Sequence, residues 1–350
     1  MGCEFIFTCQ GDSEQLCLNE MRKIAKDVML LKWLDAGVGL AVCGREFSEI
    51  SEIFREEKPV FLRHIFPAEI IFDCADGLEE FDALINGYRG KINKNTAVSV
   101  QVRNKTGEKT YDLREIKSYM SSRLENEGCL YDKANPEAII SVFISGGKIY
   151  AGMSKGEDNL SIWPGGMRRY AFDDRVISRA EFKLLELFEY FPDLLDLSEQ
   201  PQNQKNALDM GASPGGWTKI LTQKGYKVTA VDPNRLADVL LSDPNVEYHK
   251  GLAEDFINGK NKKRPAGLFD LIVNDMRMHV VQSARIMIKA WECLKENGYA
   301  VMTLKLGKSS KTAAMRAGLN ILKEKYDILF VKQLFHNRLE VTAVLRKKIF

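Results

Sequence analysis

The sequence has few cysteines and no long hydrophobic run, and these absences exclude several classes of protein. Its seven cysteines are scattered over 350 residues and form no CxxC pair, so neither a zinc site nor a redox motif is supported. We expect reduced thiols in a cytoplasmic protein. No run of eighteen apolar residues occurs, which argues against a membrane-spanning helix. The amino terminus also lacks the basic flank of a secretory signal.

A strong charge of one sign is missing as well. Lys and Arg number 50 against 48 Asp and Glu, and the net charge of +2 does not by itself demand a nucleic-acid partner. One local stretch is richer in cations, and it is either a solvated face or a surface that touches RNA. Its basic residues are Arg103, Lys105, Lys109, Arg114, Lys117 and Arg123.

The length of the chain and the order of its local patterns predict more than one domain. Residues 1–76 mix short β-like runs with two helical stretches, which is typical of a small α+β unit. Residues 77–155 begin a second such unit, with an alternating strand around Val100 and a hairpin at residues 146–147. A segment with Trp-Pro-Gly-Gly, within residues 156–177, is expected to be a linker.

From residue 178 to residue 350 the pattern changes to apolar strands that alternate with amphipathic helices. This order predicts an α/β fold with a Rossmann-like, doubly wound and mostly parallel sheet. The last two strand-like runs, “DILFVKQLF” and “EVTAVLRKK”, are separated by only a few residues. Because parallel strands need a long crossover connection, the final strand should run antiparallel.

A glycine-rich turn joins a strand to a helix in “NALDMGASPGGW”, residues 206–217. Glycines let the backbone approach a ligand that a Cβ would exclude, and the next strand ends in Asp232, whose carboxylate can accept both hydroxyls of a ribose. A dinucleotide or S-adenosylmethionine would suit this arrangement. The turn lacks the G-x-G-x-x-G spacing that holds a pyrophosphate, which favours S-adenosylmethionine.

Four charged residues occupy positions that are unusual for charges. Lys305 interrupts an apolar strand near its carboxyl end, and Asp275 ends another strand. Ligands of open α/β sheets lie beyond these ends, so both side chains should point to the ligand site. Glu340 opens the antiparallel strand and so lies at the same edge, while Lys183 lies on a preceding helix. Each alone is more commonly structural, but together they suggest a Lys-Asp-Lys-Glu set.

Such a set suits methyl transfer to a hydroxyl group. A ribose 2′-hydroxyl is a weak nucleophile, and a lysine amine accepts its proton only when neutral. A second ammonium and desolvation both disfavour the charged amine, while Asp275 and Glu340 orient the amines and partly oppose that shift. We interpret Lys305 as the base. Lys183 would hold the substrate hydroxyl or phosphate and assist deprotonation, positioning does most of the work, and no metal is required.

At these residues the chain resembles the FtsJ/RrmJ family of ribose 2′-O-methyltransferases. The motifs “SRAEFKL”, “LDMGASPGGW”, “NDM”, “TLKLG” and “LEVTAVLRK” occur in that family's order. The wider chain is similar to the type that methylates a cytidine ribose in 23S large-subunit ribosomal RNA. The resemblance implies a small ferredoxin-like unit at 1–76, an RNA-binding THUMP domain at 77–155 and the methyltransferase domain at 178–350. It makes RNA the expected partner.

The resemblance also implies site residues. Catalytic roles fall to Lys183, Asp275, Lys305 and Glu340. Contacts with S-adenosylmethionine fall to Ser178, Gly211, Ser213, Pro214, Gly215, Gly216, Trp217, Asp232, Leu252 and Asp275. Leu252 is a departure, because the family usually has an acid there that binds the adenine amino group. Either the backbone at this position or Asp255 is then expected to recognise adenine. Ser178 and Glu181 also form a predicted capping box.

Two other functions stay open at the level of the sequence. A nicotinamide-dependent oxidoreductase would share the sheet, but it requires the missing phosphate-binding spacing and gives no reason for Lys305 or Glu340. An RNA-binding protein with a degenerate methyltransferase scaffold would keep the amino-terminal half and lose turnover. An intact Lys-Asp-Lys-Glu set argues against this third hypothesis.

Overall fold

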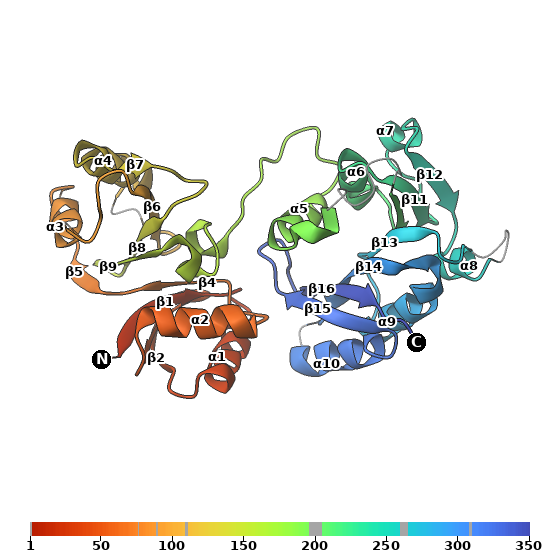
Figure 1. Cartoon of the computed structure of the whole chain (residues 1–350), viewed down its shortest axis with the longest axis horizontal. Helices are drawn as coiled ribbons and strands as arrows, with labels where there is room; N and C mark the ends of the chain where they lie inside the picture. Colours follow the sequence, from red (N-terminus) through yellow and green to blue (C-terminus); the bar gives the residue numbers. More distant parts are fainter. Residues whose placement is uncertain are drawn as a thin grey trace. The chain divides into compact units, whose positions relative to one another are not determined.

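The chain packs as two compact units, Met1–Arg168 and Arg169–Phe350, shown in a computed structural model (Figure 1). Among the described residues, no helix has both the length and the apolar composition that crossing a bilayer requires. The structure describes residues 2–75, 77–88, 90–108, 111–195, 205–259, 265–307 and 310–350.

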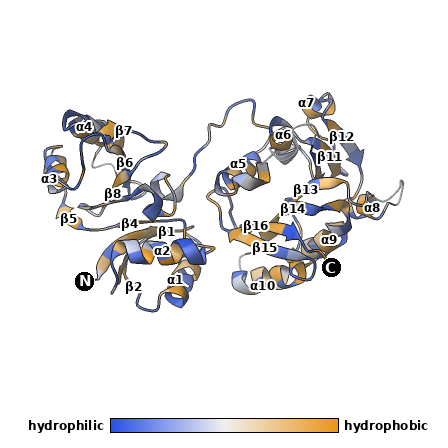
Figure 2. Cartoon of the chain, viewed as in Figure 1, coloured by the Kyte–Doolittle hydropathy of each residue, from blue (hydrophilic) through white to orange (hydrophobic). Residues whose placement is uncertain are grey.

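The first sheet of unit 1 has the strand order β2-β3-β1-β4. Its elements are β1 (Cys3–Thr8), α1 (Glu14–Ile24), β2 (Met29–Asp35), β3 (Val38–Cys43), α2 (Phe47–Glu57) and β4 (His64–Pro67). Both helices carry hydrophobic and hydrophilic residues in Figure 2. Met21, Ile50 and Phe54 on these helices are buried, so each helix covers the core with its apolar side.

The second sheet of unit 1 has the strand order β5-β9-β8-β6-β7. Its elements are β5 (Ile70–Asp73), α3 (Glu80–Gly87), β6 (Ala97–Asn104), α4 (Leu113–Asn126), β7 (Leu130–Tyr131), β8 (Ala138–Ser145) and β9 (Lys148–Lys155). The predicted strand around Val100 is β6, and the hairpin at residues 146–147 joins the antiparallel strands β8 and β9. The α+β pattern expected of this half is therefore confirmed.

Residues 156–168, within the segment expected to be a linker, are packed onto unit 1. They include the short helices η1 (Gly156–Asn159) and η2 (Pro164–Gly166). The Ser51 hydroxyl donates to the Asp158 carbonyl oxygen at 2.7 Å, and the Thr8 hydroxyl donates to the Gly165 carbonyl oxygen at 2.8 Å. The division of this half into a ferredoxin-like unit and a THUMP-like domain stays a prediction.

The basic stretch expected on unit 1 is not a uniform cationic face. The Arg123 guanidinium lies 2.9 Å from an Asp82 carboxylate oxygen, and that of Arg103 lies 5.8 Å from the ring centroid of Phe143. Lys109 lies outside the described residues. Contact between this stretch and RNA therefore stays a prediction.

Unit 2 is built on a seven-stranded sheet of order β12-β11-β10-β13-β14-β16-β15. The strand β16 pairs antiparallel with both β14 and β15, and the other pairings are parallel. The doubly wound sheet and its antiparallel final strand are thus confirmed. The strands are β10 (Asn206–Met210), β11 (Lys227–Asp232), β12 (Val246–Lys250), β13 (Phe269–Asn274), β14 (Leu294–Lys305), β15 (Tyr326–Lys332) and β16 (Glu340–Lys347).

Helices cover both faces of this sheet, with α5 and α6 on one face and α9 and α10 on the other (Figure 1). The helices are α5 (Glu181–Tyr190), η3 (Pro192–Leu195), α6 (Gly216–Gln223), α7 (Asp238–Leu241), α8 (Ala253–Ile257), α9 (Val280–Ala290), η4 (Trp291–Cys293) and α10 (Lys311–Leu322). Leu187, Trp217, Leu221, Val273 and Val301 share one buried cluster under α5 and α6. This packing fixes α5 against the strands that carry the candidate site.

Replacement of Gly152 tests how closely the backbone is packed in unit 1. It lies in β9, and a Cβ built there would come within 1.8 Å of the backbone oxygen of Pro67. We expect Gly152→Ala to lower the free energy of unfolding by about 1–3 kcal/mol, because packed backbone cannot move aside. Urea denaturation measures this change. Gly44→Ala is the matched control, since its Cβ would meet only ordinary contacts; equal stability of the two variants would contradict the expectation.

Candidate active site

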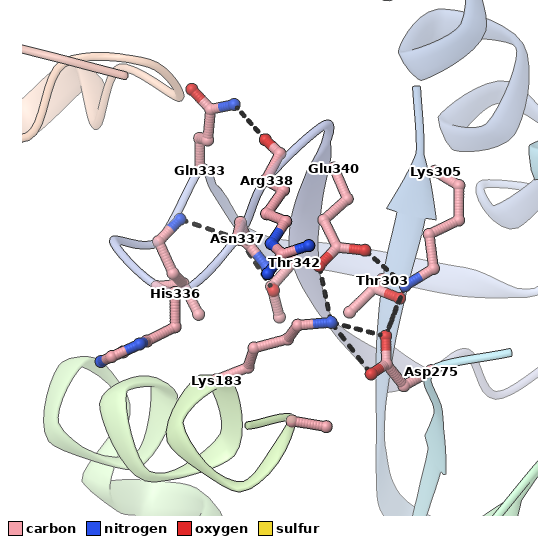
Figure 3. A network of polar contacts seen from close by, with 12 residues as sticks. Lys183, Asp275, Thr303, Lys305, Gln333, His336, Asn337, Arg338, Glu340 and Thr342 are labelled. Atoms are coloured by element: carbon pink, nitrogen blue, oxygen red, sulfur yellow. Dashed lines mark hydrogen bonds and ion pairs between the residues drawn. The ribbon is translucent and has the colours of Figure 1, made fainter. Parts of the chain in front are cut away.

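Three of the four predicted catalytic residues meet at one edge of the unit 2 sheet. Lys305 ends β14 and is the direct partner of Glu340 at the start of β16, which places both at the same edge because these strands are antiparallel. Asp275 follows the last residue of the neighbouring strand β13. Lys183 reaches the same point from α5 (Figure 3).

The four side chains form one connected set of ion pairs. The Lys183 amine lies 3.1 and 3.0 Å from the two carboxylate oxygens of Asp275, and 2.6 Å from one oxygen of Glu340. The Lys305 amine lies 2.6 Å from Asp275 Oδ1 and also pairs with the other oxygen of Glu340. Each amine therefore contacts both carboxylates.

The four charged side chains can be buried together because the two lysines and the two carboxylates neutralise one another. The side chains of Lys183, Asp275, Lys305 and Glu340 are 13%, 17%, 22% and 8% exposed, respectively. Burial by itself raises the pKa of Asp275, but the two lysines and their hydrogen bonds outweigh it and hold that pKa below its usual range. The carboxylate of Asp275 is thus kept ionised.

The protonation of Lys183 depends on the balance between burial and the two carboxylates. Burial lowers its pKa, yet Asp275 and Glu340 together outweigh burial and raise it above 10.5. At the level of the sequence, desolvation and a second ammonium were expected to disfavour the charged form of the base, and the two carboxylates to oppose that shift in part. At Lys183 the two carboxylates outweigh burial, so Lys183 stays a cation.

Thr303 belongs to the site and was missed at the level of the sequence. Its hydroxyl donates to Asp275 Oδ1 at 2.7 Å, the same oxygen that Lys305 contacts. Residues two apart on a strand share a face, so the position of Thr303 relative to Lys305 was a usable signal. Three donors on one carboxylate fix its orientation.

The glycine turn between β10 and α6 is held by Asp232. Its two carboxylate oxygens accept the backbone N–H groups of Ser213 at 3.1 Å and Asn234 at 2.7 Å. Gly211 and Gly215 have φ values of +77° and +115°, which side chains rarely adopt. The turn that contains Pro214 therefore requires glycine on both sides.

Ser178 provides a test of whether the turn fits S-adenosylmethionine. One half of the predicted capping box is present, because the Glu181 carboxylate accepts the Ser178 N–H at 3.1 Å. The other half is wrong, because the buried Ser178 hydroxyl has no hydrogen-bond partner among the described residues. A Cβ on Gly216 would come within 2.3 Å of that hydroxyl. A buried hydroxyl without a partner beside a glycine fits the polar methionine end of the cofactor.

Two predicted cofactor contacts lie differently from the rest. The Trp217 ring is buried in the core and its indole N–H donates to the Ala180 carbonyl oxygen at 2.7 Å, so the structure does not bring that ring to the turn. The exposed Leu252 precedes α8 and lines a cavity of about 410 Å³ that Asp255 lines as well. Recognition of adenine by the backbone at Leu252 and recognition by Asp255 therefore both stay predictions.

A second cavity, of about 600 Å³, lies beside Lys305. Its lining includes His279 and Val281 at the start of α9, and Ala313 and Ala317 on α10. Small side chains on α10 leave this space open. Of the four charged residues, Lys305 is the one that lines it.

Asp209 is a second residue that was not assigned to the site. It is buried in β10, and burial, with the nearby charges of Asp275 and Asp232, raises its pKa to about 7 from 3.8, while a hydrogen bond from the Thr218 hydroxyl at 2.6 Å opposes the shift. The carboxyl group therefore changes charge near neutral pH, under the glycine turn.

This raised pKa predicts how stability depends on pH. Between about pH 4 and pH 7 the folded protein holds a proton on Asp209 that the unfolded chain has released, so the free energy of unfolding falls as pH rises, by up to about 1.4 kcal/mol per unit. Asp209→Asn removes this dependence. We expect the stability of the wild type relative to the variant to decrease from pH 5 to pH 7 in urea denaturation. A constant difference would contradict the raised pKa.

Residues 176–340 match the FtsJ-like methyltransferase family. Ribosomal RNA large subunit methyltransferase M of Pseudomonas entomophila is 31% identical over 241 residues, 67% of this chain and 65% of that protein. The protein of the same name from Hahella chejuensis is 26% identical over 353 residues, 96% of this chain and 88% of that protein. TrmN from Thermus thermophilus aligns with 99% of this chain at 12% identity and a TM-score of 0.38, which is too low to carry an argument.

The alignment with the Pseudomonas relative spans slightly less than two thirds of that protein's length. The resemblance to ribosomal RNA large subunit methyltransferase M, also called RlmM, is confirmed. A nicotinamide-dependent oxidoreductase is therefore no longer a candidate function. The family match runs through Lys183, Asp275, Lys305 and Glu340. The carboxyl-terminal unit of this chain belongs to the FtsJ-like methyltransferase family.

Proposed function

We propose that this protein transfers the methyl group of S-adenosylmethionine to the 2′-hydroxyl of a ribose in RNA. One observation carries the proposal: Lys305 contacts both carboxylates of the ion-paired set and also lines the cavity of about 600 Å³. A base must touch its substrate and be oriented by other groups. Lys305 meets both requirements, whereas Lys183 does not line this cavity.

The proposed substrate is a cytidine in 23S large-subunit ribosomal RNA. It is supported by the name of the relatives, which are large-subunit ribosomal RNA methyltransferases. We propose that unit 1 is a THUMP-containing platform that holds the RNA, and that the protein works in the cytoplasm, where ribosomal RNA is made in bacteria. The platform is supported by the exposed Lys105 and Arg114 of the basic stretch.

The cofactor would be held by the glycine turn and its neighbours. The Ser178 hydroxyl and the backbone of residues 211–217 would take the methionine end, Asp232 the ribose, and either Leu252 backbone or Asp255 the adenine. Bound S-adenosylmethionine would supply an electrophilic methyl group. Asp232 already holds the turn through Ser213 and Asn234, so it would link the cofactor to the turn.

The protein's own groups would divide the work on the hydroxyl. Lys305, in its neutral form, accepts the proton of the 2′-hydroxyl. Lys183 keeps its proton and places a positive charge beside the oxygen that becomes negative. Asp275 and Glu340 hold both amines at fixed positions, and Thr303 fixes Asp275. Because orientation supplies much of the rate enhancement, the carboxylates act on the reaction through the amines.

Lys305→Ala tests the proposed base. We expect methyl transfer to RNA to fall by at least about 10²-fold, in line with the loss of a positioned base, while affinity for S-adenosylmethionine in calorimetry changes by no more than a few fold. Transfer of a radioactive methyl group to ribosomal RNA measures the activity. Lys289→Ala, which removes an exposed amine paired with Glu254, is the control. Activity of Lys305→Ala equal to that of the control would remove Lys305 as base.

Asp232→Ala tests the cofactor site. The substitution removes the proposed ribose acceptor and leaves the N–H groups of Ser213 and Asn234 without their carboxylate, so we expect affinity for S-adenosylmethionine to fall by about tenfold or more. Calorimetric titration measures it. Asp238→Ala, which removes an exposed carboxylate paired with Arg235, should bind as the wild type does. Unchanged affinity after Asp232→Ala would place the cofactor elsewhere.

A further inference from the structure

A cluster of aromatic rings lies beside the ion-paired set and has no part in the chemistry proposed above. The rings of Tyr170 and Phe182 stack with centroids 5.4 Å apart and planes at 20°. The His336 ring lies 5.4 Å from Tyr170 and 5.1 Å from Phe182. Phe172 meets Phe182 edge to face at 6.2 Å.

The cluster is built from the same elements that deliver two of the four charged residues. Phe182 precedes Lys183 on α5, and His336 lies in the loop that leads to Glu340. Figure 3 shows His336 next to α5, with Lys183 extending from that helix toward Glu340. A group bound on these rings would therefore be close to the site of methyl transfer.

Buried hydrogen bonds keep the cluster in one arrangement. The fully buried carboxylate of Glu186 accepts the backbone N–H groups of Phe335 at 2.8 Å and His336 at 3.0 Å. The Tyr170 hydroxyl donates to a Glu189 carboxylate oxygen at 2.8 Å. Both acceptors belong to α5, so the loop and the segment before the helix are tied to one support.

The outer end of the cluster is an exposed ring next to a cation. Phe172 is 63% exposed, and the Arg179 guanidinium lies 5.6 Å from its ring centroid. The nearby acid Asp173 is paired with Arg175 at 2.6 Å, while Arg169 and Arg338 are exposed. An exposed aromatic face with arginine beside it is the arrangement on which unpaired bases stack.

We propose that Phe172 and Arg179 form a stacking platform for an unpaired nucleobase of the RNA substrate. This inference rests on the proposed function and extends it to recognition of the substrate. Sequence-specific recognition of RNA takes place mainly at unpaired nucleotides, whose bases leave the stack. An unstacked base then needs a new surface, and Phe172 offers one, with cations that suit the phosphates.

Phe172→Ala in the full chain tests the platform. Stacking on an aromatic side chain contributes enough to binding that we expect the KM for ribosomal RNA from cells lacking this protein to rise by about fivefold or more. Affinity for S-adenosylmethionine should stay unchanged, which shows that unit 2 remains folded. Phe172→Trp should have a KM close to that of the wild type, which a purely structural role would not predict. Val239→Ala is the control, because Val239 is an apolar residue of unit 2 with similar exposure, 68%.

A direct probe of stacking separates this inference from the proposed function. A short single-stranded RNA that contains 2-aminopurine should lose fluorescence on binding to the wild type and to Lys305→Ala, and should lose much less on binding to Phe172→Ala or Arg179→Ala. Equal quenching by Phe172→Ala and the wild type, or an unchanged KM, would overturn the platform. Absence of methyl transfer by the wild type would overturn the proposed function while leaving the result of the fluorescence experiment unaffected.

Discussion

Two amines and two carboxylates neutralise one another at a single edge of the unit 2 sheet, and this compensation allows four charges to be buried where their elements meet. A buried charge without a partner costs several kcal/mol. The set is therefore stable only as a whole, because removal of Glu340 or Asp275 would leave both amines with one carboxylate between them. The arrangement for which we propose proton transfer is thus also the one in which these buried charges compensate one another.

Topology is what allows residues so far apart in the chain to meet. Asp275 and Lys305 come from the carboxyl ends of parallel strands, while Glu340 comes from the amino end of β16, the antiparallel member of the sheet. The buried cluster of Leu187, Trp217 and their neighbours then holds α5 so that Lys183 reaches the same point. The meeting of the four residues follows from strand direction and from helix packing together.

The sequence predicted the sheet and the four charged residues because each signal was local. Apolar runs marked the strands, and Lys305 and Asp275 stood out as charges at strand ends. The charged state of Lys183 and the burial of the Trp217 ring were not predictable in this way. Both depend on contacts with segments distant in the chain, as does the pairing of Tyr170 with His336. Thr303 is an intermediate case, since strand alternation pointed to it.

The direct pairing of Lys305 with Glu340 across β14 and β16 has a consequence for how this protein tolerates sequence change. Side chains alternate between the faces of a strand, so a slip of one residue in β16 would carry Glu340 to the opposite side of the sheet. Val341 would then occupy the place of a carboxylate. Length changes in the turn that precedes β16 preserve this pairing only when the strand keeps its alignment. A deletion inside β16 would move Glu340 away from Lys305 even where the sheet itself survives.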